Sequence, residues 1–170
     1  MTSKPSLSKI KKLAPQFLLR IINKAKKRLK TDPVMLSIFK EYDADIEEID
    51  YLPTYFKDLD VSAKTDHGIV WLNYSLLLDG FDLKDHSYLI HEYTHVMQQT
   101  MGSKATKSTE NESYLDNKHE QEGFQNQIEF ISNHYGDNKA EEYVDDLLDH
   151  HDIEDDDKRD ELESVFLKNV

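Results

Sequence analysis

Between Leu89 and Met101, apolar residues recur at the spacing of one face of an α-helix. The segment reads LIHEYTHVMQQTM, and its apolar side chains are those of Leu89, Ile90, Tyr93, Val96, Met97 and Met101. Residues three and four apart share a face of a helix, so this pattern predicts a helix with one buried side. Asp82 or Asp85 can cap its start, and Gly102 ends it. The rest of the chain must supply the surfaces that cover the buried side.

The same predicted helix carries the pattern H-E-x-x-H at His91, Glu92 and His95. Two histidines four residues apart lie on one helix face, so both imidazoles can bind one zinc ion. A glutamate between them can take a proton from a water molecule on that ion. The pattern therefore predicts a metal site with Glu92 as general base. The alternative is a chance match in a helical domain that holds no metal.

Composition restricts the ligands of such a site. The chain has no Cys, which excludes disulfides, zinc ribbons and thiol catalysis and leaves His and carboxylate groups as the protein ligands of any zinc. A catalytic zinc needs a third protein ligand and an open position for water. The candidates lie at the start of the next predicted helix and are His119, Glu120 and Glu122. Glu120 and Glu122 cannot point the same way on a helix.

The whole sequence predicts one α+β domain, mainly helical, with a small antiparallel sheet; its 170 residues suit a single domain. Apolar residues at helical spacing predict further helices over 15–30, 34–43, 118–135, 137–148 and 157–168. Short strands are expected at 46–52, 61–64 and 69–72. The polar segment 103–117 predicts a mobile surface loop.

The charge distribution divides the chain near residue 30. Residues 1–30 contain 10 Lys and Arg and no Asp or Glu, whereas the rest contains 11 basic and all 34 acidic residues. Residues 1–30 therefore predict a basic amphipathic N-terminal helix, and residues 31–170 form the main domain. The basic residues within 4–30 either pack on this acidic domain or contact an anionic surface. The main domain is expected not to bind nucleic acid, because its surface is acidic.

The start of the chain does not resemble a secretory signal, because Arg20 interrupts its apolar run and no cleavage site follows. No run of about 18 apolar residues predicts a membrane span. The sequence thus favours a cytoplasmic protein, of bacterial or viral origin. An organellar transit peptide is the alternative, which the excess of Lys over Arg in residues 1–30 disfavours.

The segment HEYTHVMQQ, preceded by IVWLN and followed by a helix carrying Glu-x-Glu-Gly-Phe, resembles the minimal gluzincin metallopeptidases. In these zinc enzymes the motif often reads HELTHVVQQ, and the third ligand is a glutamate directly before a small residue. Carried over, the resemblance implies His91, His95 and Glu122 as zinc ligands, with Glu120 and then His119 as the alternatives. It covers roughly residues 45–135.

The resemblance also implies an activity: zinc-dependent hydrolysis of peptide bonds in a protein substrate, with Glu92 as the base and Zn²⁺ as the cofactor. The substrate would pair with an edge strand at residues 69–72. The rival interpretation is a metallopeptidase-like binding or regulatory protein that holds zinc with little turnover. Many gluzincins stabilise the oxyanion with a further His or Tyr, and the sequence offers no clear counterpart. The candidates are Tyr93, His134 and Tyr135.

Overall fold

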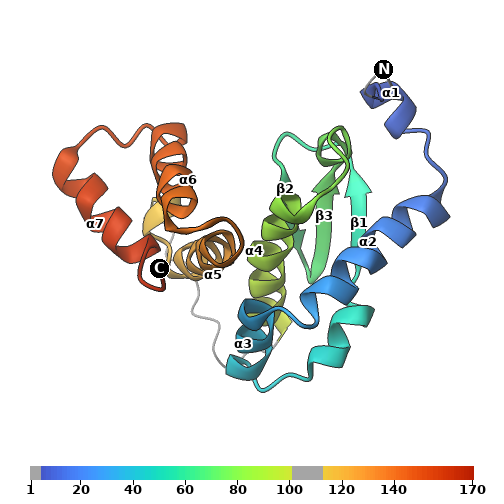
Figure 1. The fold of residues 1–170 in the computed structure, drawn as a ribbon, viewed down its shortest axis with the longest axis horizontal. Helices are drawn as coiled ribbons and strands as arrows, with labels where there is room; N and C mark the ends of the chain where they lie inside the picture. The colour runs from blue at the N-terminus through green and yellow to red at the C-terminus, as the bar shows by residue number, and fades with distance from the viewer. Residues whose placement is uncertain (1–4, 101–112) are drawn as a thin grey trace.

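The central helix, α4 (Leu83–Thr100), lies between a small sheet and helix α5 (Lys118–Tyr135), as Figure 1 shows. The arrangement is that of a computed structural model, which describes residues 5–100 and 113–170. The fold is α+β and mainly helical, which confirms the predicted class. Helix α4 is buried along most of its length, His91 and Glu92 included. The helix that carries the H-E-x-x-H pattern is therefore a central element of the larger hydrophobic cluster.

Three helices precede the sheet: α1 (Leu7–Ile10), α2 (Pro15–Leu29) and α3 (Pro33–Glu41). Both prolines occupy the first turn, where the missing N–H removes no helical hydrogen bond. Asp32 caps α3, because its Oδ1 accepts a hydrogen bond from the Val34 N–H at 2.9 Å. The helices predicted over 15–30 and 34–43 are thereby confirmed.

The sheet has the strand order β1-β3-β2, formed by β1 (Thr54–Lys57), β3 (Ile69–Asn73) and β2 (Ala63–Asp66). Strands β2 and β3 are antiparallel and are joined by His67 and Gly68, whose positive φ values of 48° and 75° suit a tight hairpin. Strand β1, however, runs parallel to β3. The sheet is mixed, so the prediction of an antiparallel sheet is wrong for β1.

Two further sequence predictions for this region are corrected. Residues 46–52 were expected to form a strand, but Ile46–Tyr51 is a 3-10 helix, η1. Asp45 and Glu48 form a capping box at its start, and their side chains satisfy main-chain N–H groups that a strand would have paired. Residues 69–72 were expected at the sheet edge but lie in the central strand. The edge beside α4 is β2, because β2 pairs only with β3 among the described strands.

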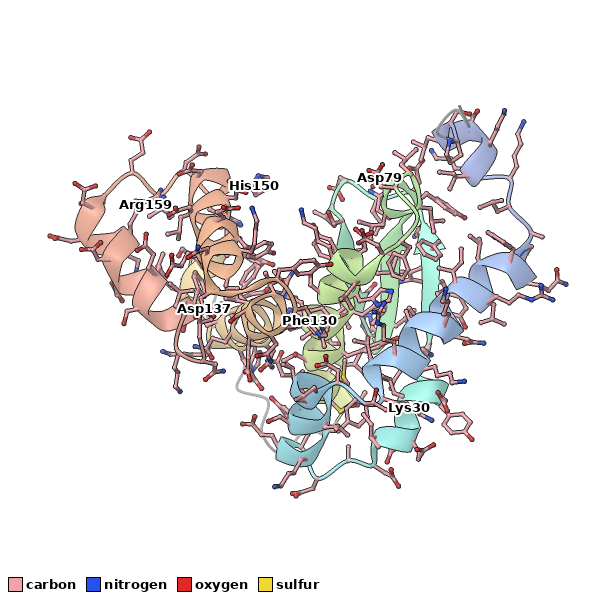
Figure 2. The ribbon with its side chains drawn as sticks, viewed as in Figure 1. Lys30, Asp79, Phe130, Asp137, His150 and Arg159 are labelled. Atoms are coloured by element: carbon pink, nitrogen blue, oxygen red, sulfur yellow. The ribbon has the colours of Figure 1, made fainter. Side chains whose placement is uncertain are left out.

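Helix α5 separates two hydrophobic clusters. It contributes Phe130 to the first, with α2, α3, α4 and the sheet, and Figure 2 shows this ring at the junction with α4. Its other apolar side chains, including Phe124 and Ile128, pack in the second with α6 (Asp137–His150) and α7 (Asp156–Phe166). The short helix η3 (Tyr114–Asp116) adds Leu115 there. Through the two clusters, α5 joins α4 and the sheet on one side to α6 and α7 on the other.

The predicted loop at 103–117 lies outside the described residues up to 112, as does Gly102. The described end of that segment forms η3. The helices predicted over 118–135, 137–148 and 157–168 are confirmed as α5, α6 and α7. Over the two described ranges, no helix combines the length and the apolar character that crossing a membrane requires.

The basic helix α2 packs its apolar side on the first cluster, where Ile22 and Leu29 are buried. Lys26 is buried as well, and its Nζ donates to the Leu52 carbonyl at 2.6 Å. Its outward face carries Arg20, Lys24 and Lys27, which are exposed. The contact of residues 4–30 with an anionic surface stays a prediction, and Lys4 lies outside the described residues.

His86 makes the stability of this fold depend on pH. Its ring is buried against Phe81, and burial, with the charge of Arg28 next, lowers its pKa from 6.5 to about 4. Between about pH 6.5 and pH 4, His86 therefore binds a proton in the unfolded chain but not in the folded chain. The contribution of neutral His86 to the free energy of unfolding is fully present above pH 6.5 and is lost as the pH falls toward 4.

We expect the unmodified protein to lose about 2.5 kcal/mol more stability than His86→Gln between pH 7.5 and pH 4.5. Gln keeps a polar group of similar reach but cannot take up a proton. The measurement is urea unfolding of both proteins at each pH. Asp85, whose pKa burial raises to about 6, affects both proteins alike and cancels in the comparison. Equal pH dependence in the two proteins would show that His86 is not the cause.

Candidate metal centre

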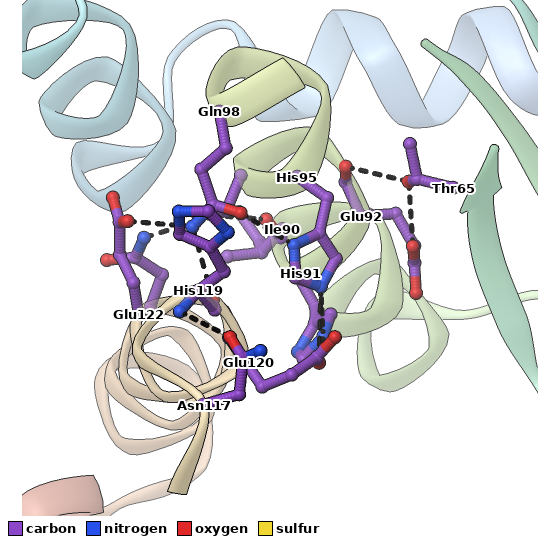
Figure 3. A network of polar contacts seen from close by, with 12 residues as sticks. Thr65, Ile90, His91, Glu92, His95, Gln98, Asn117, His119, Glu120 and Glu122 are labelled. Carbon is purple, nitrogen blue, oxygen red and sulfur yellow. Dashed lines mark hydrogen bonds and ion pairs between the residues drawn. The ribbon is translucent and has the colours of Figure 1, made fainter. Parts of the chain in front are cut away.

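Three side chains from two helices bring one ligand atom each to a common point (Figure 3). His91 and His95 lie one turn apart on α4, and their Nε2 atoms are 3.0 Å apart. Glu120, in the first turn of α5, places Oε2 3.3 Å from each of them. Asn117 fixes this first turn, because its Oδ1 accepts hydrogen bonds from the main-chain N–H groups of His119 and Glu120.

The spacing of these three atoms fits a tetrahedral zinc ion. Ligand bonds of about 2.0–2.1 Å at tetrahedral angles put neighbouring ligand atoms about 3.3–3.4 Å apart. The three observed separations, 3.0, 3.3 and 3.3 Å, lie close to this value. Two imidazoles with one carboxylate are also a common catalytic zinc ligand set, and that set leaves one position open. The residues therefore fit a metal ion of this kind.

The charges of the three groups are strongly coupled. Burial alone would raise the pKa of Glu120, but hydrogen bonds from His91 and His95 outweigh it and hold that pKa far below its usual range. Burial alone would lower the pKa of His95, but the hydrogen bond and charge of Glu120, with the charge of Glu92, raise it to about 9. The site thus concentrates negative charge around two imidazoles, as a cation site requires.

The two imidazoles are held in different ways. His95 places Nδ1 2.7 Å from Oε1 of the buried Gln98, an orienting hydrogen bond of the sort that supports metal-ligating histidines. Nδ1 of His91 is buried and has no hydrogen-bond partner among the described residues. The His91 ring is held by packing instead. It lies edge-on to Phe124, with centroids 4.5 Å apart, and meets the backbone of α5 at Gly123.

Glu92 is buried beside the ligands, on the side of α4 that faces β2. Thr65 of β2 places its hydroxyl 2.7 Å from Oε2 and 3.0 Å from the main-chain oxygen of Glu92. This contact holds the carboxylate toward the same cavity that the ligands face. The structure thus brings together His91, Glu92 and His95, the three residues of the H-E-x-x-H pattern, at one cavity.

The cavity has a volume of about 620 Å³ and opens between the sheet and the C-terminal helices. Residues 60–65 form its sheet side, while His91, Glu92 and His95 form its floor. Its opposite wall is mostly aromatic and apolar. That wall consists of Tyr88, Tyr114, Phe124, Tyr143, Leu147, His150 and His151. A chain segment several residues long has room to lie over Glu92.

The structure corrects the third ligand. Glu122, which the resemblance implied, does not face the imidazoles: both its carboxylate oxygens accept hydrogen bonds from the Tyr42 hydroxyl, at 2.8 and 2.9 Å. Glu120 takes the place beside His91 and His95. The reason is helix geometry, since residues two apart on a helix point about 200° apart. His119, the other alternative, is not part of the group.

The three candidates for stabilising an oxyanion do not line the cavity. Tyr93 is fully buried and shares a hydrogen bond of 2.8 Å with Thr54, and Nε2 of His134 lies 2.7 Å from Asp32. The cavity offers Tyr114 instead, which the sequence placed in a loop. Partial burial, followed by the negative charge of Glu120, raises the pKa of its hydroxyl.

Gly123 allows the close packing of the His91 ring on α5. A Cβ atom at this position would lie 3.0–3.1 Å from three atoms of the imidazole ring. We therefore expect Gly123→Ala to push the His91 ring aside and to weaken zinc binding by about 10-fold or more. The same change removes a helical glycine, so helix α5 itself should gain up to about 1 kcal/mol. Zinc titration and urea unfolding of the metal-free protein measure the two effects separately, and unchanged zinc affinity would show that the ring has room to move.

Comparisons with known proteins give no relative for this chain: no family model, curated protein or solved structure matches it. The resemblance to gluzincins therefore rests on the HEYTHVMQQ motif and the residues around it. The function has to be inferred from the geometry of the site.

Proposed function

We propose that this protein is a zinc-dependent metallopeptidase that cleaves peptide bonds in a protein substrate. One observation carries the proposal: His91, His95 and Glu120 present three ligand atoms at tetrahedral spacing, and Glu92 lies beside them in the same cavity. Zinc suits the site better than magnesium or calcium, because two of the three ligands are imidazoles.

Each residue has a defined task in this proposal. His91, His95 and Glu120 would hold the ion, which, when bound, lowers the pKa of a water molecule and polarises a peptide carbonyl. Glu92 accepts the proton of the attacking water on its carboxylate and delivers it to the nitrogen of the leaving amine. Thr65 keeps the Glu92 carboxylate directed into the cavity through the hydrogen bond to Oε2.

The substrate is proposed to bind as an extended strand along β2. This strand ends the sheet on the cavity side, and Ala63, Lys64 and Thr65 line the cavity. A peptide can add to such an edge by main-chain hydrogen bonds, which requires no particular sequence. The aromatic wall opposite then contacts its side chains. An unfolded segment of a protein fits this geometry, whereas a folded surface does not reach Glu92.

The experiment is a cleavage assay on an unstructured polypeptide such as casein. The protein is freed of metal with a chelator, dialysed and assayed before and after one equivalent of zinc is added. We expect no cleavage without metal and full activity with zinc, because the three ligand residues hold one ion. Stoichiometric zinc binding without cleavage of any unstructured substrate would favour the rival function, a regulatory protein that holds zinc. Absence of zinc binding would overturn the proposal.

A further inference from the structure

Gln98 connects the ligand His95 to Glu122, which is not a ligand. Its Oε1 lies 2.7 Å from Nδ1 of His95. Its Nε2 donates to Oε2 of Glu122 at 2.7 Å and to the main-chain oxygen of His119 at 3.1 Å. Gln98 itself is 2% exposed, so its amide lies in the interior of the fold. Figure 3 shows the series of contacts from Glu122 through Gln98 to the imidazole.

These contacts allow only one orientation of the Gln98 amide. The oxygens of Glu122 and His119 are both acceptors, and the amide NH₂ group has two hydrogens to donate to them. A flipped amide would place Oε1 against two other oxygens and lose both of the hydrogen bonds that Nε2 donates. The Tyr42 hydroxyl lies within hydrogen-bond distance of both oxygens of the Glu122 carboxylate, which keeps that group in place.

The orientation of the amide determines which nitrogen of His95 carries the proton. An amide oxygen only accepts, so Nδ1 of His95 must donate to it. In the neutral imidazole, Nε2 then has the free lone pair. Nε2 is the atom that faces His91 and Glu120. The carboxylate of Glu122 thus acts on the metal centre without contacting it.

We propose that Glu122 and Gln98 are positioning residues that fix His95 in the tautomer able to bind the metal. The inference rests on the proposed zinc site and gives Glu122 a role other than that of ligand. Glu122 enforces the amide orientation, the amide enforces the Nδ1–H tautomer, and the tautomer presents Nε2 to the ion. When a metal binds, His95 gives up one proton, and with Glu122 in place it keeps the proton on Nδ1. Loss of Glu122 would permit the other tautomer, in which the proton that stays is on Nε2 and competes with the metal.

The test is zinc affinity, measured by competition with a chelator at pH 7.5. Glu122→Gln keeps the size of the side chain but adds a donor, so the Gln98 amide is free to turn. We expect zinc affinity to fall about 10- to 100-fold, the usual effect of losing an orienting partner. The matched control is Glu129→Gln, which removes the same charge from the same helix and should change affinity less than 2-fold, about the limit of a surface charge effect.

We call the series of contacts from Glu122 through Gln98 to His95 the relay. A double-mutant cycle separates an effect of this relay from simple charge attraction between Glu122 and the ion. In a Gln98→Ala background the relay is already broken, so Glu122→Gln should cause no further loss of affinity. An equal loss in both backgrounds would mean that Glu122 acts through its charge, and would overturn the relay. Circular dichroism of each variant confirms that it is folded.

A measurement on the unmodified protein completes the test. In zinc-loaded protein with ¹⁵N-labelled histidine, NMR should show a slowly exchanging proton on Nδ1 of His95. A proton on Nε2, or metal on Nδ1, would overturn the relay while leaving zinc binding established. Failure of the unmodified protein to bind zinc would instead overturn the proposed function and the relay with it.

Discussion

Replacing Glu92 by Gln is expected to abolish peptide hydrolysis while leaving zinc bound. Gln has the size of Glu and can still accept the hydrogen bond from Thr65. It cannot take a proton from water at neutral pH, and loss of a general base lowers rates by about 10²–10⁴-fold. Glu92 is not one of the three grouped ligand residues, so stoichiometric zinc should be retained. The measurements are the rate of casein cleavage and the zinc content of the purified variant.

The control for this prediction is Glu129→Gln, a carboxylate on α5 that does not line the cavity. It should cleave casein at the rate of the unmodified protein. Cleavage by Glu92→Gln at the parental rate would exclude Glu92 as the base. Loss of zinc from Glu92→Gln would make the result a binding defect, and the assay would then be repeated at saturating zinc.

The second large effect is expected from Glu120→Ala, which should weaken zinc binding about 10³-fold or more. It removes one of three protein ligands, a loss of roughly 4 kcal/mol in binding free energy. Glu122→Ala should cost less, because Glu122 acts only through Gln98. Zinc stabilises a protein in proportion to the logarithm of its affinity. The rise in melting temperature with added zinc should therefore be large in the unmodified protein, smaller in Glu122→Ala and nearly absent in Glu120→Ala.

The reverse order would contradict the assignment of ligands. If Glu122→Ala abolished the zinc-dependent rise and Glu120→Ala preserved it, the third ligand would be the residue that the family resemblance implied. The metal-free proteins provide the control, since the melting temperature of each variant without zinc reports the structural cost of its substitution alone.

The helix that carries the site was predictable because its signal is local. Apolar residues at helical spacing around HEYTH define α4, and the positions of His91, Glu92 and His95 on it follow from helix geometry. The α+β class was predictable for the same reason, since most of the helices have amphipathic patterns of their own.

The residues around Glu120 and Glu122 do not by themselves determine which glutamate lies beside His91 and His95, because this depends on which face of α5 packs against α4. A signal was nevertheless present in the sequence. Gly123 lies three residues after Glu120, on the same helix face, and a Cβ atom at this position would lie 3.0–3.1 Å from the His91 ring. In the gluzincin pattern the ligand glutamate directly precedes a small residue, which pointed to Glu122. The position of Gly123 on the same helix face as Glu120 points to Glu120 instead.

The direction of β1 and the wall of the cavity depend on contacts between distant segments. Strand β1 pairs with β3 on the side away from the hairpin strand β2, an arrangement that the alternation of residues within β1 does not specify. Tyr114 and Tyr143 reach the cavity from elements that pack there only through the second hydrophobic cluster. That these two tyrosines line the cavity can be recognised only from the tertiary packing of the helices.

The most direct test of the account is a crystal structure of the zinc-loaded protein with anomalous data at the zinc edge. We expect one ion within about 2.0–2.2 Å of Nε2 of His91, Nε2 of His95 and an oxygen of Glu120. Glu122 should remain hydrogen-bonded to Gln98. An ion held by Glu122 in place of Glu120, or no ion at these atoms in a protein saturated with zinc, would contradict it.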